Sequence, residues 1–179
     1  VAVGNYFIQE VLKYIHLAMY DALRFLKTDG TYNQDTASQA VKDASSRGPV
    51  WSYDLTAATD RIPLIVQKQI MEFLDEEIGS LWGDIMDNYP YYHNSRTDNV
   101  IYSVGQGMGL YSSWSNLAFF NHAILQYAQY LGTGSYSYTT KYRVLGDDIA
   151  IWSKAASSWY RRLITDVLSI PISEQKSFV

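Results

Sequence analysis

Two adjacent aspartates, Asp147 and Asp148, follow Gly146 in the middle of the apolar segment 142–152. The apolar flanks predict two short strands, with the Gly-Asp-Asp sequence at the tight turn of a hairpin. Paired carboxylates beside buried strands are costly unless a cation neutralises them, so the pattern predicts a divalent-metal site. The alternative is an ordinary Asp-rich turn, in which the side chains only bond to nearby backbone amides.

A second pair of carboxylates, Asp54 and Asp60, lies upstream. Asp54 ends an apolar stretch that alternates like a strand. Asp60 precedes a helix that Pro63 is suited to open, so it is either a site residue or the N-cap of that helix. Two-metal nucleotidyl transfer takes carboxylates from at least two strands, and Asp54 with the Gly-Asp-Asp hairpin supplies such a set.

Three glycines within residues 105–109 precede a helical pattern that begins near Ser112. Glycines let one backbone approach another closely, and amides at a helix N-terminus suit an anion. No Gly-Lys-Ser or Gly-Lys-Thr follows, so the segment is not a P-loop. The alternatives are a flexible loop with a serine N-cap, and an Asn116 side chain that points to solvent rather than into a site.

Lys176 follows a strand-like stretch near the end of the sequence. A lysine here is either solvated, or holds a phosphate as a point charge and protonates a leaving pyrophosphate.

The spacing of apolar residues predicts the elements that would position these side chains. Helices are predicted at 6–27, 36–43, 63–79, 112–130 and 155–168, and strands at 50–55, on both sides of the hairpin and within 170–179. Residues 84–100 are predicted to form a loop. Helices and strands do not alternate as a regular βαβ array, so the sequence favours an α+β fold.

Composition limits the kinds of function. The 179 residues suffice for one domain with one core, and an apolar fraction of 47% predicts a packed chain. With a net charge of −4 the chain as a whole is not a basic nucleic-acid binder, so contacts with a polyanion must be local or made through a metal ion. The absence of cysteine excludes disulfides and thiolate metal sites. No apolar run is long enough to predict membrane insertion.

Four motifs, in order along the chain, resemble motifs A, B, C and D of viral RNA-dependent RNA polymerases of the mitovirus and narnavirus-like group. They lie near 51–63 and at 105–122, 142–152 and 156–178. In mitoviruses motif A resembles Asp-Leu-Ser-Ala-Ala-Thr-Asp-Arg-Leu-Pro, motif B resembles Gly-Gln-Pro-Met-Gly-x-Tyr-Ser-Ser-Trp, and motif C resembles Val-Leu-Gly-Asp-Asp. The resemblance covers nearly the whole chain and implies that residues 1–179 form a right-hand polymerase palm, a small antiparallel sheet backed by helices, with part of the fingers.

The resemblance implies a role for each carboxylate of the hairpin and of motif A. Asp54 and Asp147 would be the principal ligands of two Mg²⁺ ions, or of Mn²⁺ in their place, and Asp148 would assist. Lys176 in motif D would be the general acid.

The resemblance also implies a nucleotide-binding set. Asp60 would sense the ribose 2′-hydroxyl, with Asn116 and either Ser112 or Ser113 nearby, and Gly109 would belong to the same nucleotide site. Such a polar set distinguishes RNA from DNA precursors because the 2′-hydroxyl both donates and accepts hydrogen bonds.

The implied activity is templated RNA synthesis that replicates a viral RNA genome. The partners would be an RNA template, a primer or nascent strand, NTPs, and the fingers part (motif F) and thumb of the same polypeptide, expected before Val1 and after Val179. The alternatives are a reverse transcriptase-like polymerase, and a non-catalytic RNA-binding or endogenised viral remnant. The location would be the host cell, in the mitochondrion for a mitovirus and otherwise in the cytoplasm.

Overall fold

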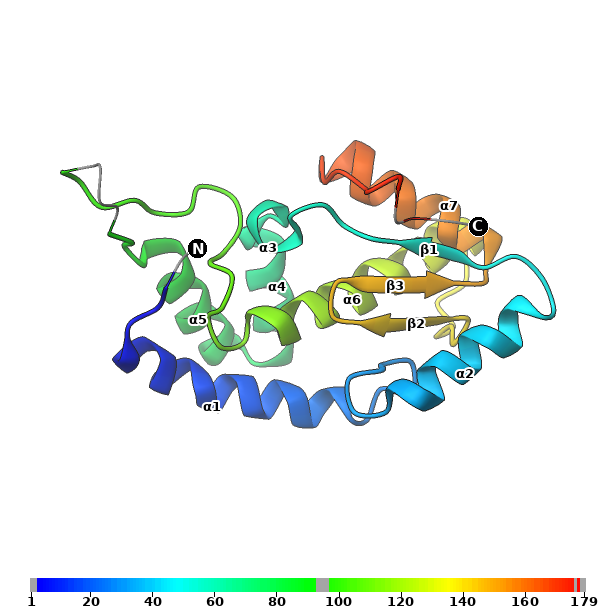
Figure 1. Ribbon diagram of the computed structural model, residues 1–179, viewed down its shortest axis with the longest axis horizontal. Coiled ribbons are helices and arrows are strands. Elements are labelled where there is room, and N and C mark those ends of the chain that lie inside the picture. The colour runs from blue at the N-terminus through cyan, green and yellow to red at the C-terminus, as the bar shows by residue number, and fades with distance from the viewer. Residues whose placement is uncertain (1–2, 93–96, 176, 178–179) are drawn as a thin grey trace. The chain divides into compact units, whose positions relative to one another are not determined.

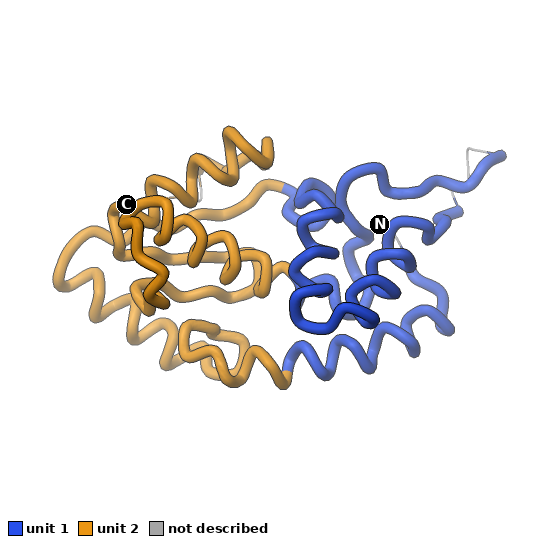
Figure 2. The backbone as a smooth tube through the Cα atoms, turned by 180° about the vertical axis from the view of Figure 1, so that it is seen from behind, with its two compact units in different colours: residues 1–20, 57–116 blue, residues 21–56, 117–179 orange. Residues whose placement is uncertain are grey.

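The computed structural model describes residues 3–92, 97–175 and 177. The fold is α+β, as the sequence predicts, with a three-stranded antiparallel sheet and helices (Figure 1). The chain divides into two compact units, formed by residues 1–20 with 57–116 and by residues 21–56 with 117–179 (Figure 2). The length alone does not predict this division.

The helices and strands follow in this order: α1 (Tyr6–Leu23), α2 (Gln34–Ser45), β1 (Trp51–Tyr53), α3 (Ala58–Arg61), α4 (Leu64–Leu74), α5 (Glu76–Asn88), α6 (Ser113–Thr133), β2 (Tyr142–Leu145), β3 (Asp148–Ile151), α7 (Lys154–Arg162) and the π-helical turn η1 (Leu163–Val167). Within the described ranges, no helix is both long and apolar enough to cross a membrane.

The sheet belongs to the second unit and has the strand order β1-β3-β2. One of its faces is buried, because alternate residues of each strand are apolar and project to the same side. These are Tyr53, Tyr142, Val144, Ile149 and Ile151. Helices α6 and α7 supply contacts to this face: the Tyr53 and Ser157 hydroxyls share a 2.8 Å hydrogen bond, and His122 Nδ1 lies 2.8 Å from the Tyr142 hydroxyl.

The loop after α1 is bonded to the outer side of β2. The Val144 amide donates to the Thr28 carbonyl at 3.0 Å, and the Gly30 amide donates to the Val144 carbonyl at 2.7 Å. The Asp29 carboxylate, in the same loop, lies 3.0 Å from His122 Nε2. Both side chains are buried, with exposures of 2% for Asp29 and 7% for His122. This network makes His122 a core residue of the second unit.

In the first unit, the single helix predicted for residues 63–79 is two helices. Helix α4 ends at Leu74, and Asp75 is extended at φ −159° and accepts a 2.9 Å hydrogen bond from the Ile78 amide. Asp75 is thus the N-cap of α5, which continues to Asn88 and takes the place of the start of the predicted loop. The prediction that Gly79 ends a helix is wrong. Gly79 lies inside α5, where a Cβ atom would be 2.3 Å from the Glu72 amide nitrogen.

Two other boundaries differ from the prediction. Helix α1 ends at Leu23 rather than at residue 27, and α7 gives way to η1 after Arg162. In place of a C-terminal strand, the described residues after 169 form one isolated bridge, between Leu55 and Ile172. Residues 176, 178 and 179 lie outside the described residues.

Candidate active site

The Gly-Asp-Asp hairpin forms where the sequence predicts it. Leu145 at the end of β2 pairs with Asp148 at the start of β3, so the loop has two residues, Gly146 and Asp147. Gly146 has φ 63°, and a positive φ at the first loop position is typical of a type II′ turn. Glycine meets this requirement without strain, which explains its place before the two aspartates.

A buried asparagine, Asn121 of α6, holds this turn. Its Nδ2 donates to the Gly146 carbonyl at 2.8 Å, and its Oδ1 accepts a 2.6 Å hydrogen bond from the Tyr160 hydroxyl. Asn121 and Tyr160 are both fully buried. Sequence reasoning missed Asn121, although an amide within the apolar run 117–125 is the signal that could have identified it.

Asp54 directly follows β1, where the strand register brings it towards the hairpin. Tyr53 pairs with Ile149, so continuing the antiparallel register by one residue sets Asp54 opposite Asp148. The segment after η1 fixes the backbone of Asp54. Its amide donates to Ser177 Oγ at 3.2 Å, and its carbonyl accepts from the Ser173 amide at 2.9 Å.

The carboxylates at this end of the sheet suit a hard divalent cation. Like charges directly opposite on neighbouring strands destabilise a sheet, and a bound cation would remove that repulsion. Among the described residues, no three His, Asp or Glu side chains are gathered into a complete metal-ligand group. This is compatible with Mg²⁺, which is typically held by one or two carboxylates together with water and substrate phosphate. Asp148 also lines a cavity of about 350 Å³ beside α2.

Asp60 belongs to the first unit and lies within α3. The N-caps of α3 and α4 are Ala57 and Pro63, so the interpretation of Asp60 as a helix cap is wrong. Its side chain is exposed and is hydrogen-bonded by Tyr102. Burial and this hydrogen bond raise the pKa of the Tyr102 hydroxyl, which therefore stays a donor to Asp60.

The glycine loop packs directly on the backbone that carries Asp60. A Cβ atom on Gly105 would lie 2.2 Å from the Thr59 carbonyl oxygen and 2.5 Å from the Asp60 carbonyl carbon. The Gln106 amide donates to the same Thr59 carbonyl at 2.9 Å. The predicted close approach of backbones is confirmed at Gly105. Gly109, the last glycine of the loop, has φ 93°, a conformation that favours glycine.

Ser112, which precedes α6, uses its polar groups within the first unit. Its hydroxyl accepts from Trp82 Nε1 at 2.8 Å and donates to the Tyr111 carbonyl, and its amide donates to His16 Nδ1 at 3.1 Å. Burial lowers the pKa of His16, which keeps the ring neutral and Nδ1 able to accept. The sequence did not indicate either His16 or Trp82 as a supporting residue.

Ser113 and Asn116 differ from Ser112 in having unused polar atoms. The Ser113 hydroxyl and both side-chain polar atoms of Asn116 are buried, with no hydrogen-bond partner in the part of the chain that the structure describes. The two residues are three apart on α6 and therefore face the same side. Buried polar groups without partners are rare in folded proteins and often mark a functional site.

The candidate residues are thus divided between the two units. Asp54, Asp147 and Asp148 belong to the second unit, and Asp60, Gly109, Ser112, Ser113 and Asn116 belong to the first. Lys176 lies outside the described residues.

Comparisons with known proteins agree on the kind of chain this is. A model of the mitovirus RNA-dependent RNA polymerase family matches residues 1–179. The chain is 33% identical, over its whole length, to the RNA-directed RNA polymerase of Cryphonectria parasitica mitovirus 1, of which it spans 22%. Over 88% of its length it is also 33% identical to an uncharacterized mitochondrial protein of Arabidopsis thaliana, of which it spans 64%.

One solved structure has a similar fold. The structure of apo telomerase from Candida tropicalis, truncated from its C-terminal domain, aligns over 96% of this chain and 40% of the telomerase chain. The TM-score is 0.59 at 10% sequence identity, a likeness of fold alone, and it supports the predicted polymerase-type palm. The family match over the whole length leads to one conclusion: this chain belongs to the mitovirus RNA-dependent RNA polymerase family.

Proposed function

We propose that this chain supplies the nucleotidyl-transfer centre of an RNA-dependent RNA polymerase that replicates a viral RNA genome. In this reaction the 3′-hydroxyl of an RNA strand attacks the α-phosphate of an incoming NTP, and pyrophosphate leaves. The observation that carries the proposal is the register of β1 and β3, which sets Asp54 opposite Asp148 beside the Gly146-Asp147 turn.

Asp54, Asp147 and Asp148 would hold two divalent ions, Mg²⁺ or Mn²⁺. When bound, such ions neutralise charge on the attacking and leaving oxygens. The chain's own contribution is positioning. Asn121 bonds to the Gly146 carbonyl and fixes the turn that carries Asp147, and Ser173 and Ser177 bond to the backbone of Asp54. Lys176 remains the proposed general acid, because motif D is where the family resemblance puts it.

Asp60, Ser113 and Asn116 would recognise the ribose of the incoming NTP, with Gly109 in the adjoining loop. Ser113 is the better candidate than Ser112 for the hydroxyl of motif B, because the Ser112 hydroxyl already bonds to Trp82 and Tyr111. A ribose 2′-hydroxyl can both donate and accept, so it would satisfy groups that are otherwise buried without a partner.

The proposed setting is the mitochondrion of a host cell. It rests on the family match to mitovirus polymerases and on the identity with mitochondrial proteins of Arabidopsis thaliana. The proposed partners are template RNA, nascent RNA and NTPs, and further parts of a longer polymerase, since the chain spans 22% of its mitoviral relative.

The second candidate is a non-catalytic, endogenised relative of such a polymerase. It is favoured by the identity of 33% and 27% with two uncharacterized mitochondrial proteins of a plant. The retention of Asp54, Asp147 and Asp148 favours the enzyme, because an RNA-binding remnant has no need of three acidic residues at the end of a sheet.

Metal binding separates the two candidates. We expect Mn²⁺ to raise the melting temperature of the 179-residue chain, because a ligand at about a hundredfold excess over its Kd adds about 2.7 kcal/mol to the free energy of unfolding. The increase should disappear in Asp54→Asn and persist in the control Asp87→Asn, which alters an exposed carboxylate on α5. An equal increase in both variants, or none in the unmodified chain, would contradict the proposed metal site.

A further inference from the structure

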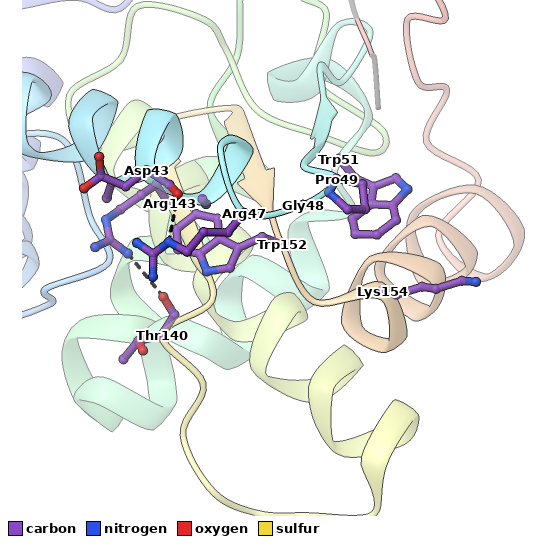
Figure 3. A pocket seen from close by; sticks show the side chains of 11 residues that line it. Asp43, Arg47, Gly48, Pro49, Trp51, Thr140, Arg143, Trp152 and Lys154 are labelled. Carbon is purple, nitrogen blue, oxygen red and sulfur yellow. Dashed lines mark hydrogen bonds between the residues drawn. The ribbon is translucent and has the colours of Figure 1, made fainter.

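A cavity lined by cationic and aromatic side chains lies within the second unit, at the end of the sheet away from the acidic turn. Its volume is about 600 Å³, a size typical of ligand sites. The lining comes from the end of α2, residues 47–51, the start of β2 and the segment that follows β3 (Figure 3). Trp152 directly follows β3 and lies four residues after Asp148, so the cavity and the turn are about 13 Å apart at about 3.3 Å per residue.

The charge of this cavity is opposite to that of the chain. Arg47, Arg143 and Lys154 line it with a single acidic residue, Asp43, whereas the whole chain carries a net charge of −4. In the described ranges no carboxylate forms an ion pair with any of the three cations. The cavity lining therefore carries a net positive charge, with three cations against the one carboxylate of Asp43, and these cations form no ion pair among the described residues.

The two guanidinium groups are oriented by backbone carbonyls. Arg47 Nε donates to the Asp43 carbonyl at 2.9 Å, and Arg143 Nη1 donates to the Thr140 carbonyl at 3.2 Å. A guanidinium has five N–H donors, so each retains donors for an external anion. Arg presents these donors in a planar fork that matches the geometry of phosphate oxygens.

Two indole rings accompany the cations. Trp51 and Trp152 are both half-buried, and the Arg143 guanidinium lies 5.4 Å from the ring centroid of Trp152. In the view of Figure 3, Arg47, Arg143 and Trp152 lie on one side of Gly48, and Trp51 and Lys154 lie on the other. Aromatic faces interleaved with cations are the combination that binds single-stranded nucleic acid, because bases stack on the rings while phosphates contact the charges.

We propose that this cavity binds a segment of single-stranded RNA, with a base stacked on an indole and phosphates on Arg47, Arg143 and Lys154. The site is additional to the proposed catalytic centre, because binding here requires neither the carboxylates nor a metal ion. RNA fits better than an acidic peptide, because a peptide carboxylate would pair with the cations and leave two half-exposed indole faces unused.

The test is fluorescence anisotropy of a labelled oligouridylate on the 179-residue chain in EDTA, which removes any contribution from metal. We expect Trp152→Leu to weaken binding at least tenfold, because one base–aromatic stack is lost while an apolar side chain is kept. The double variant Arg47→Gln, Lys154→Gln should also weaken binding. It should reduce the slope of log affinity against log salt by about 0.7 for each phosphate contact removed.

A second tryptophan–arginine pair in the same unit gives a matched control. The Arg162 guanidinium lies 5.2 Å from the ring centroid of Trp159 on α7, outside the cavity. Trp159→Leu and Arg162→Gln should leave the affinity and the salt slope unchanged. Asp147→Asn should also bind RNA as the unmodified chain does, so a failure of the proposed function would not be mistaken for a failure of this site.

Competitors show which ligand the site takes. Single-stranded DNA should bind comparably, because stacking and phosphate contact do not read the 2′-hydroxyl, and duplex RNA should bind more weakly because its bases are already stacked. The proposal is overturned if the cavity variants bind like the controls or if the unmodified chain binds no oligouridylate at low salt. Displacement of the RNA by a poly-glutamate peptide at equal charge concentration would also overturn it, and would identify a surface for an acidic protein segment.

Discussion

Ser112, just before α6, and Ser113, its first residue, have different surroundings, and this difference bears on which of them is the better candidate for binding the nucleotide. The Ser112 hydroxyl satisfies the buried indole N–H of Trp82, whereas the Ser113 hydroxyl is buried without a partner among the described residues. A hydroxyl that already bonds to the protein is a poor ligand for a ribose, so the residue-level environment favours Ser113.

We therefore expect different effects from the two alanine substitutions. Ser112→Ala should lower the free energy of unfolding by about 1–3 kcal/mol, since it leaves the Trp82 N–H buried and unpaired. Ser113→Ala should leave stability within about 0.5 kcal/mol and reduce the preference for NTP over dNTP in the complete polypeptide that carries this sequence. Urea unfolding and single-nucleotide incorporation measure the two effects. Equal stability losses, or unchanged preference in Ser113→Ala, would contradict the assignment.

His16 makes the same region sensitive to pH. Burial lowers the pKa of His16 from its ordinary value of 6.5. At a pH between the folded-state pKa and 6.5, the unfolded chain therefore binds more protons than the folded chain. The contribution of His16 to stability is therefore complete above about pH 6.5 and is lost as the pH falls towards the folded-state pKa. Protonation also removes the Nδ1 acceptor of the Ser112 amide.

The corresponding measurement compares urea midpoints at about pH 7.5 and about pH 5.5. The midpoint should fall more on acidification in the unmodified chain than in His16→Gln, which cannot titrate in this range. Identical pH dependence in the two proteins would show that His16 does not contribute as described.

At the scale of elements, side chains of α6 and α7 position the hairpin that carries the two aspartates through hydrogen bonds. The amide of Asn121 links the Gly146 carbonyl to the Tyr160 hydroxyl, and all three residues are buried. The turn geometry thus depends on a side chain that lies 25 residues away in the sequence.

Asn121→Ala should lower the free energy of unfolding by about 2–3 kcal/mol, because it leaves a carbonyl and a hydroxyl buried without partners. It should also weaken the Mn²⁺-dependent rise in melting temperature, since Asp147 is on the same turn. Asn88→Ala, which removes an exposed side-chain bond to the Asp84 carbonyl, is the matched control and should change stability by less than about 0.5 kcal/mol. A similar loss in both variants would argue against a special role for Asn121.

The sequence predicts those elements whose residue pattern is local, and it misses the features that depend on contacts between distant segments. The alternation around Gly146 and the helical spacing of α6 are local signals, and both elements form close to the expected positions. The break between α4 and α5 is not predictable from spacing alone, because apolar residues continue across Asp75, and only its capping bond to Ile78 reveals the boundary. The partners of Asn121 and Trp82 could not be predicted either, since they come from packing between distant segments.

At the scale of the whole molecule, the acidic end of the sheet and the residues of motif B that are proposed to bind the nucleotide belong to different compact units. The motifs were recognised from the sequence because each is a short run of residues. The division was not, because each unit combines two separate stretches of chain. The proposed metal ligands Asp54, Asp147 and Asp148 all belong to the second unit, so metal binding is expected from that unit.

The central claim is that the carboxylates at the end of the sheet carry out nucleotidyl transfer. Its most direct test is primer extension on an RNA template by the complete polypeptide that carries this sequence, with NTPs and Mg²⁺. We predict that Asp147→Asn reduces extension at least about a hundredfold with an unchanged melting temperature, because metal ligands supply several kcal/mol of transition-state stabilisation. The control Asp87→Asn should extend normally. Templated extension by Asp147→Asn at the unmodified rate would contradict the account.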